Sequence, residues 1–308
     1  MAEDYSTRKI EFHSGFIAVV GKPNVGKSTL VNTIVGQKIS IISPKPQTTR
    51  HRILGVRTGV NYQLVFVDTP GIHQPEDELG NYMENTYKNE IRDSEIILYV
   101  ADISHPPTVY DHRTRRLLSE LKAENIPVFL AMNKIDIISR ERIEKNKSKY
   151  MKLLDFNEVF EISALKGIGV ADLENRLVSY LPLGPPYFPS DQLTDQSPEL
   201  LASEIVREKI LMKTRQEVPH GVFVHTAEVR EGVNSDDLYF NIIIYVERDT
   251  HKGILIGKSG NRLKEIGSLA RNELEFLLKK KVYLDLWVKV KTDWKERKGL
   301  LKSWGYES

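Results

Sequence analysis

A glycine-rich segment near the N-terminus has the residue types that bind the phosphate groups of a nucleotide. Residues 21–28 read GKPNVGKS and match the pattern G-x-x-x-x-G-K-[ST], between a buried strand and a helix. Glycine lets backbone N–H groups close around a phosphate, and the start of a helix adds partial positive charge. Lys27 supplies a charge that bridges two phosphates, and the hydroxyl of Ser28 is a ligand for Mg²⁺. We therefore expect a phosphate-binding loop here.

Residues 68–71 (DTPG) end a second strand and have the residue types of a magnesium switch. The carboxylate of Asp68 can orient Mg²⁺ through a water molecule, and the N–H group of Gly71 can face a terminal phosphate. In isolation the same four residues form a common turn. Their position after the phosphate loop and after a strand favours the switch.

Residues 133–136 (NKID) follow another buried strand and predict recognition of guanine. The carboxylate of Asp136 can accept hydrogen bonds from both N1–H and the exocyclic amino group of this base. Adenine lacks this pair of donors, so a carboxylate here rejects ATP. At a further strand end, residues 163–165 (SAL) can place a backbone N–H group on O6 of guanine. GTP and GDP are therefore the expected ligands.

The elements that must position these motifs alternate along the first half of the chain. Apolar runs at 15–20, 62–67, 95–101, 127–132 and 159–162 predict strands, and segments with helical periodicity lie between them. This alternation predicts an α/β P-loop domain with a mostly parallel sheet and helices on both faces. Such a sheet binds ligands at the carboxyl ends of its strands, where all three motifs lie.

A proline-rich linker separates this domain from a part of the chain with a different pattern. Residues 181–189 contain four of the 14 prolines. The periodicities that follow predict the order helix–strand–strand–helix–helix–strand, which describes a smaller α+β domain. Residues 251–308 carry 14 Lys and Arg residues against 7 Asp and Glu residues. The expected organisation is an N-terminal extension (1–14), a GTPase domain (15–181), a linker (182–198) and a second domain with a basic C-terminal tail (199–308).

A Gly-x-x-Gly turn in the second domain predicts binding of single-stranded RNA. Residues 257–260 (GKSG) follow an apolar run and precede a basic helix. Such a turn lets a nucleic-acid backbone approach closely, and a lysine in it can bind a phosphate. A turn that only caps the helix is the alternative, and the surrounding positive charge favours RNA. The expected RNA-binding residues are Ile256, Gly257, Lys258, Ser259, Gly260, Arg262 and Lys264.

Aromatic residues near the C-terminus suggest that bases stack there, but another interpretation is favoured. Trp287, Trp294, Trp304 and Tyr283 are the candidates. Because Trp287 and Tyr283 lie in an expected strand, half-buried packing is the favoured role for both.

The ordered motifs resemble those of translation-factor-related small GTPases over residues 15–181, and the second domain resembles a type II KH domain. Together the two domains resemble the Era-type GTPases over nearly the whole chain, including residues 47–51 (QTTRH) and 204–209 (EIVREK). The resemblance implies GTP hydrolysis, binding of 16S ribosomal RNA near its 3′ end, and a role in the assembly of the small ribosomal subunit.

The resemblance also assigns roles around the expected nucleotide. It identifies residues 46–52 as the switch, with Thr49 completing the Mg²⁺ shell and Thr48 as the alternative. Ile72 stands where many signalling GTPases have a glutamine that positions water, so we expect slow hydrolysis without help. Asn24 resembles a residue that helps to hold K⁺, and a role in shaping the loop is equally open.

The expected site therefore draws on several segments of the first domain. The expected catalytic residues are Lys27, Asn24, Thr49 and Gly71, and the expected metal ligands are Ser28, Thr49 and Asp68. The expected GTP-binding residues are Gly21, Lys22, Pro23, Asn24, Val25, Gly26, Lys27, Ser28, Thr29, Asp68, Thr69, Pro70, Gly71, Ile72, Asn133, Lys134, Ile135, Asp136, Ser163, Ala164 and Leu165.

Composition limits the other functions of the chain. It has no cysteine, which excludes disulfides and thiolate zinc sites. Its first 13 residues contain no apolar run long enough for a signal peptide, and no apolar run approaches the roughly 18 residues of a membrane helix, so we expect neither. We expect a cytoplasmic monomer, with peripheral contact at the inner face of the cell membrane as a further expectation. The alternative function is a membrane-surface signalling GTPase whose basic C-terminal domain contacts anionic lipid.

Overall fold

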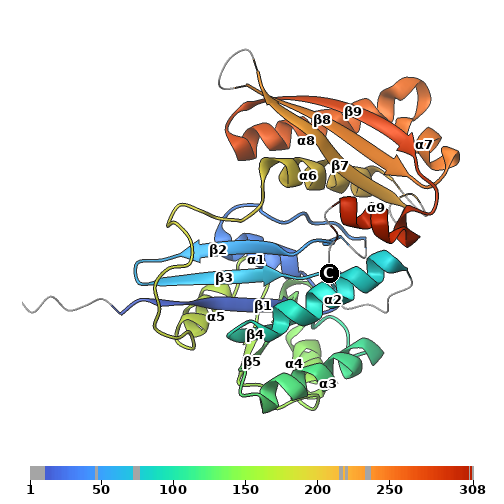
Figure 1. Cartoon of the computed structure of the whole chain (residues 1–308). Coiled ribbons are helices and arrows are strands. Elements are labelled where there is room, and N and C mark those ends of the chain that lie inside the picture. The colour runs from blue at the N-terminus through green and yellow to red at the C-terminus, as the bar shows by residue number, and fades with distance from the viewer. Residues whose placement is uncertain are drawn as a thin grey trace, which may run out of the picture.

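A six-stranded sheet forms the centre of the first domain (Figure 1). In spatial order its strands are β2 (Ile53–Thr58), β3 (Tyr62–Asp68), β1 (His13–Val20), β4 (Ile96–Asp102), β5 (Val128–Asn133) and β6 (Glu158–Glu161). All neighbours pair in parallel except β2, which is antiparallel to β3. The computed structural model describes residues 11–45, 48–71, 77–214, 218, 221–232, 237–304 and 306.

Helices cover both faces of this sheet. Their bounds are α1 (Lys27–Val35), α2 (Glu78–Arg92), α3 (Val109–Ala123), the 3-10 turn η1 (Ile135–Ile137), α4 (Arg140–Tyr150) and α5 (Val170–Val178). Successive residues of β1 point to opposite faces, as in any strand. Ile17 packs with α1 and α5, whereas Ala18 packs with α2, α3 and α4. The first domain is therefore a three-layer α/β structure, as the sequence predicted.

The second domain has a three-stranded sheet in the order β7 (Val222–Glu231), β8 (Asp237–Val246), β9 (Lys281–Val290). Strand β7 is antiparallel to β8, and β8 is parallel to β9. The other elements are α6 (Pro198–Lys213), α7 (Asp249–Ile256), η2 (Lys258–Gly260), α8 (Asn261–Leu278), η3 (Trp294–Glu296) and α9 (Lys298–Ser303). Helices α6 and α8 pack on one face of the sheet. The predicted α+β domain with its helix first is confirmed.

Strand β2 is an element that the sequence analysis did not predict. It is an edge strand that follows the expected switch, and its glycine, Gly55, interrupts the apolar pattern. A Cβ atom at Gly55 would lie 2.7 Å from side-chain atoms of Val31 and Ile39, so α1 packs directly against the strand backbone. Gly55 thus weakens the sequence pattern of β2, but close packing of α1 against the strand requires it.

The expected linker is bound to the first domain along much of its length. The amide oxygen of Gln63 accepts hydrogen bonds from the N–H groups of Tyr187 and Phe188, at 2.7 and 3.0 Å. Further on, the N–H group of Val56 donates to Leu193 O at 2.9 Å. The linker thus approaches the second domain along the edge formed by β2. None of the helices in the part of the chain that the structure describes combines the length and the apolar character needed to cross a bilayer.

Candidate nucleotide site and nucleic-acid interface

The phosphate loop joins β1 to α1 and depends on two glycines. Gly26 has a φ of +102°, and a Cβ atom there would lie 2.2 Å from Nδ2 of Asn133. A Cβ atom at Gly21 would lie 2.3 Å from the carbonyl oxygen of Val100. Only glycine fits such close approaches, so the loop can lie directly against the ends of β4 and β5.

Lys27 begins α1 and is buried, with 6% of its surface exposed. Its ammonium group donates to the carbonyl oxygens of Gly21 and Lys22, at 3.1 and 3.2 Å. Burial lowers the pKa of Lys27 to about 8, and attraction to Asp68 offsets part of this effect. Phosphate oxygens would restore the stability of the charged form.

Ser28, Thr49 and Asp68 are the expected magnesium ligands, and Ser28 and Thr49 line the pocket while Asp68 does not. The hydroxyl groups of Ser28 and Thr49 lie 3.1 Å apart. Asp68 is fully buried, and among the described residues neither of its carboxylate oxygens has a hydrogen-bond partner. Burial raises the pKa of Asp68, and the positive charge of Lys27 offsets part of that shift. Hard oxygen donors beside an unpartnered buried carboxylate fit Mg²⁺.

The two threonines considered as magnesium ligands have different environments. The hydroxyl of Thr48 donates to Lys45 O at 2.6 Å, whereas that of Thr49 faces Ser28. The geometry therefore favours Thr49 over Thr48. Pro46, Gln47 and Ile72, which the sequence analysis also named, lie outside the described residues.

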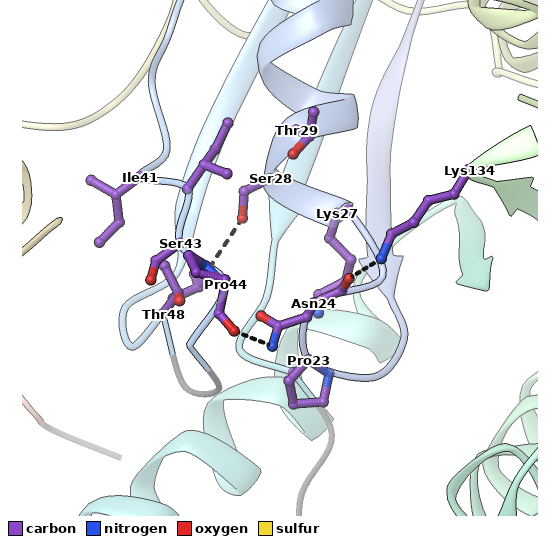
Figure 2. A pocket seen from close by; sticks show the side chains of 14 residues that line it. Pro23, Asn24, Lys27, Ser28, Thr29, Ile41, Ser43, Pro44, Thr48 and Lys134 are labelled. Atoms are coloured by element: carbon purple, nitrogen blue, oxygen red, sulfur yellow. Dashed lines mark hydrogen bonds between the residues drawn. The ribbon is translucent and has the colours of Figure 1, made fainter. Parts of the chain in front are cut away.

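Lys27, Ser28 and Thr49 line a pocket of about 320 Å³ (Figure 2). Its lining combines the phosphate loop with a segment that the sequence analysis missed, residues 41–44. Asn24 connects the two, because its side-chain amide donates to Pro44 O at 2.8 Å. The residues that line the pocket are Pro23, Asn24, Gly26, Lys27, Ser28, Thr29, Ile41, Ile42, Ser43, Pro44, Thr48, Thr49, Gly71 and Lys134. The types of residues 41–44 carry no nucleotide-binding signal, and only the fold brings them here.

Asn133 joins the three segments expected around the base. Its side-chain amide donates to Val25 O at 2.8 Å and accepts from the N–H group of Ala164 at 2.9 Å. Asp136 is exposed in η1, where its carboxylate is accessible to a base, and Leu165 is 76% exposed. The arrangement leaves an open edge at which the carboxylate can select guanine.

Lys134 has partners that explain its place in the motif. Its ammonium group donates to the backbone oxygen of Asn24 at 2.8 Å and to Oδ2 of Asp102 at 2.7 Å. Burial acts to raise the pKa of Asp102, but hydrogen bonds from Lys134 and Ser104 outweigh it and hold the pKa below its usual range. The sequence analysis missed Asp102, although its position directly after the predicted strand 95–101 was a usable signal.

Several predicted nucleotide-binding residues use their side chains elsewhere. The Lys22 ammonium group donates to Oδ2 of Asp111 at 2.9 Å, and the Thr69 hydroxyl donates to Val19 O at 2.8 Å. Val25 packs in the core, and the Ser163 hydroxyl accepts from the N–H group of Lys166 at 3.2 Å. The partially buried Ile135 packs on the other face of the sheet, and Pro70 is buried. Backbone groups are what these positions can offer a nucleotide.

The switch segment also contacts the second domain. Arg207 of α6 donates a hydrogen bond to the backbone oxygen of Thr48. Arg50 donates to Val222 O, at the start of β7, at 2.7 Å. The ring of His51 stacks on Tyr306 with centroids 4.4 Å apart. Thr49, which faces the magnesium site, therefore lies between residues held by the second domain.

The charges at this contact are buried and compensated. Arg207 Nε donates to Glu204 at 2.8 Å. Burial acts to raise the pKa of Glu204, but the attraction of Arg207 outweighs it and lowers the pKa. Burial lowers the pKa of His51 to about 4 and raises that of Tyr306 to about 12, so both rings are neutral at pH 7. Glu208 of the same helix accepts from the N–H group of Ile42 at 2.8 Å. Helix α6 thus contacts two segments that line the pocket, at Thr48 and at Ile42.

A second concavity lies beside the Gly-x-x-Gly turn. A groove of about 790 Å³ runs between α8 and β9. Gly257 has a φ of +73°, and a Cβ atom there would lie 2.8 Å from Cβ of Arg262. Among the predicted residues, Gly260 and Lys264 line the groove; Ile256, Gly257, Lys258, Ser259 and Arg262 lie in or beside the turn without lining it. The turn allows a backbone to approach the mouth of the groove.

The sequence analysis missed most of the groove. Its lining residues are Tyr239, Gly260, Leu263, Lys264, Gly267, Ser268, Arg271, Tyr283, Leu284, Asp285 and Leu286. Arg271 follows Lys264 by seven residues, which places both on the same face of a helix. That spacing was a usable signal, whereas the contribution of β9 required the fold.

Comparison with known proteins agrees with this architecture. Residues 16–134 match the family of 50S ribosome-binding GTPases, and residues 217–295 match the KH domain family. The chain is 46% identical over 301 residues to GTPase Era of Ruminiclostridium cellulolyticum, covering 97% of this chain and 99% of that protein. It is 45% identical over 295 residues to GTPase Era of Clostridium kluyveri, covering 96% and 99%.

Two solved structures are similar over both domains. One is an Aquifex aeolicus Era variant bound to GDP and AlF4⁻, with 42% identity and a TM-score of 0.92. The other is Era in complex with MgGDPNP and nucleotides 1506–1542 of 16S ribosomal RNA, also with 42% identity and a TM-score of 0.92. Each similarity covers 96% of this chain and 100% of the other.

The buried ammonium group predicts that nucleotide affinity depends on pH. With burial lowering the pKa of Lys27 to about 8 and bound phosphates raising it, nucleotide binding takes up a proton as the pH rises through about 8. Affinity is therefore full below this pKa and falls as pH rises through it. From pH 7 to pH 8.5 we expect the Kd for GTP to rise about fourfold, measured by calorimetry in buffers that differ in ionisation enthalpy.

The control for this prediction is Lys27→Met, which retains any titration of the nucleotide itself. It should bind more weakly and lose the part of the pH dependence and of the proton uptake that comes from Lys27. A wild-type Kd that stays constant over this range, without proton uptake, contradicts the assignment of Lys27.

Proposed function

Because the chain belongs to the Era family of GTPases, we propose that it is a GTP-dependent switch that binds 16S ribosomal RNA near its 3′ end and acts in assembly of the small ribosomal subunit. GTP binding and hydrolysis follow from membership of the family, and Mg²⁺ is the cofactor. The single observation that carries the RNA assignment is the groove beside residues 257–260, in a chain 42% identical to an Era bound to this RNA.

The nucleotide pocket provides the groups that this chemistry needs. Ser28, Thr49 and Asp68 would hold Mg²⁺, which neutralises charge on the two terminal phosphates. Lys27 would donate to oxygens of these two phosphates, and the N–H group of Gly71 would face the terminal one. Without a glutamine after Gly71, backbone groups must orient the attacking water, so we propose slow hydrolysis until a further group contributes.

The groove in the second domain is suited to an extended single strand. Lys264 and Arg271 project from α8 on one side, and the edge strand β9 forms the other. The turn at residues 257–260 admits a phosphate next to Lys258. We also propose that the protein acts as a monomer in the cytoplasm, with peripheral membrane contact through its basic C-terminal block.

Charge reversal in the turn tests the RNA assignment. Replacing Lys258 and Ser259 by Asp places two negative charges against phosphates and removes one positive charge. We expect about 100-fold weaker binding of single-stranded RNA in a filter or fluorescence assay, with unchanged GTP turnover. The wild-type affinity should also fall steeply with salt, and less steeply after the change.

The matched control is Lys145→Asp with Ser148→Asp, two exposed residues of α4 that undergo the same change in charge. This variant should bind RNA normally. If the turn variant keeps its RNA affinity and only loses thermal stability, the turn merely caps a helix. If the protein binds anionic vesicles and unlabelled single-stranded RNA does not compete with them, the membrane alternative replaces this proposal.

We propose further that Asn24 contributes to a K⁺ site beside the phosphates. Its side-chain nitrogen is engaged with Pro44, which leaves the amide oxygen as the atom that can face a cation. Exchange of K⁺ for Na⁺ should slow GTP hydrolysis of the wild type more than that of Asn24→Ala, measured as phosphate release at saturating nucleotide. Equal wild-type rates in both salts would leave Asn24 with a loop-shaping role alone.

A further inference from the structure

One face of the second sheet is only partly covered. Helices α6 and α8 pack against the face that bears Phe240, Ile242 and Ile244. The residues that alternate with these point to the opposite face, and most of them are half-buried or exposed. We call this side of β8 and β9 the open face.

Aromatic side chains stand on the open face near the edge of the sheet. Trp287 is 56% exposed and Tyr283 is 41% exposed, both on β9. The cross-strand register pairs Trp287 with Ile243 and Tyr283 with Tyr239. Trp287 is therefore more exposed than the half-buried packing that the sequence favoured, whereas Tyr283 is close to that expectation. The exposure of Trp287 requires another explanation, because a tryptophan in water is costly.

The exposed residues of the open face lie on β9, whereas those of β8 are half-buried. Trp304 from the C-terminal tail stacks on Phe223 and Tyr245, with centroids 4.0 and 4.8 Å away. Trp304 thus covers these two aromatic residues, and no described residue of the tail stacks on Trp287. Among the described residues, no aromatic ring stacks on Trp287 or Tyr283, and the ammonium group of Lys281 lies over the Tyr283 ring, 5.2 Å from its centroid.

The carboxylate of Asp285 accepts hydrogen bonds from Trp287 and from Tyr239. Oδ2 of Asp285 accepts a hydrogen bond from Nε1 of Trp287 at 2.8 Å and from the hydroxyl of Tyr239 at 3.4 Å. The one polar donor of the indole is therefore satisfied within the strand, and its ring is fixed. A fixed ring loses little conformational entropy when a flat partner stacks on it.

The open face continues directly into the groove. Tyr239, Tyr283 and Asp285 belong to the open face by their position in the strands, and all three also line the groove. A chain that leaves the groove across β9 therefore meets Tyr283 and then Trp287. On this strand the two aromatic residues lie between Lys281 and Lys289, which point to the same face.

We propose that the open face around Trp287 binds, by stacking, bases of single-stranded RNA that extend beyond the groove. This inference rests on the proposed RNA-binding function and adds a second subsite to it. Aromatic platforms bind bases of any sequence, and flanking lysines hold the phosphates. Asn241 and Asp285 interrupt the apolar surface, which suits bases better than the continuous apolar face of a protein partner.

RNA length separates the two subsites. A KH groove holds about four nucleotides, so a tetranucleotide reports the groove alone and a decanucleotide reports both subsites. The probes are a decanucleotide from the 3′ end of 16S ribosomal RNA and the tetranucleotides that tile it. Trp287→Ala should weaken the decanucleotide about tenfold and leave the tetranucleotides unchanged, and Trp287→Phe should restore most of the affinity.

The matched control is Phe276→Ala, which removes an exposed aromatic residue of α8 that is 68% exposed and stands away from the groove. It should bind both RNA lengths like the wild type. Tryptophan fluorescence gives an independent readout, because Trp294 is buried and Trp287 is the most exposed of the three tryptophans. The decanucleotide should quench emission in the wild type and lose most of this effect in Trp287→Phe.

The possible failures are distinguishable. If no RNA binds the wild type, the proposed function fails and the subsite with it. If tetranucleotides bind and the decanucleotide is equally tight to wild type and Trp287→Ala, the subsite is refuted while the groove stands. If Trp287→Ala leaves the RNA affinity unchanged but weakens binding of this protein to a protein of the small ribosomal subunit, the open face is a protein interface.

Discussion

Residues 48–51 are held by both domains at once, and the relation between the two sites depends on this constraint. Thr49 faces Ser28 in the nucleotide pocket, while its neighbours are bound by Arg207, Val222 and Tyr306. Consecutive Cα atoms are separated by about 3.8 Å, so one of these residues cannot move far without the next. We therefore expect a change in the metal site to alter the contacts of the second domain.

The contact is maintained by buried charge and by aromatic packing together. Arg207 and Glu204 are nearly inaccessible, and removing one partner of such a pair typically costs about 3–5 kcal/mol. Around Tyr306, residues of α2 meet residues of β7 and the C-terminal tail in one apolar cluster. Figure 1 shows α9 at this junction, beside α2. The C-terminal tail therefore belongs to the same unit as the switch rather than to a separate extension.

The sequence predicted those parts of the site in which one short segment of the chain binds the ligand. Lys27 with Ser28, and Asn133 with Asp136, are recognisable because a phosphate or a base is bound by one short segment. The alternation of strands and helices predicted the layered sheet for a similar reason, since burial on two faces leaves a local pattern. The expected domain bounds and the individual roles of the site residues remain predictions.

The missed features are those that tertiary structure creates. Residues 41–44 reach the pocket because α6 holds them there, and the groove exists because β9 lies beside α8. Trp287 was expected to pack, because periodicity within a strand cannot tell which face a neighbouring element covers. Strand β2 was missed because Gly55, needed for contact with α1, weakens its pattern.

The most direct test of the account uses Asp136→Asn, whose amide suits a base with an oxygen at position 2, and measures RNA affinity with different nucleotides. The account predicts that a non-hydrolysable xanthosine triphosphate raises the RNA affinity of this variant, whereas the guanosine analogue at the same concentration does not. In the wild type the preference should be the reverse. An unchanged response of the variant to the guanosine analogue, or a wild-type RNA affinity that is independent of nucleotide, would contradict the account.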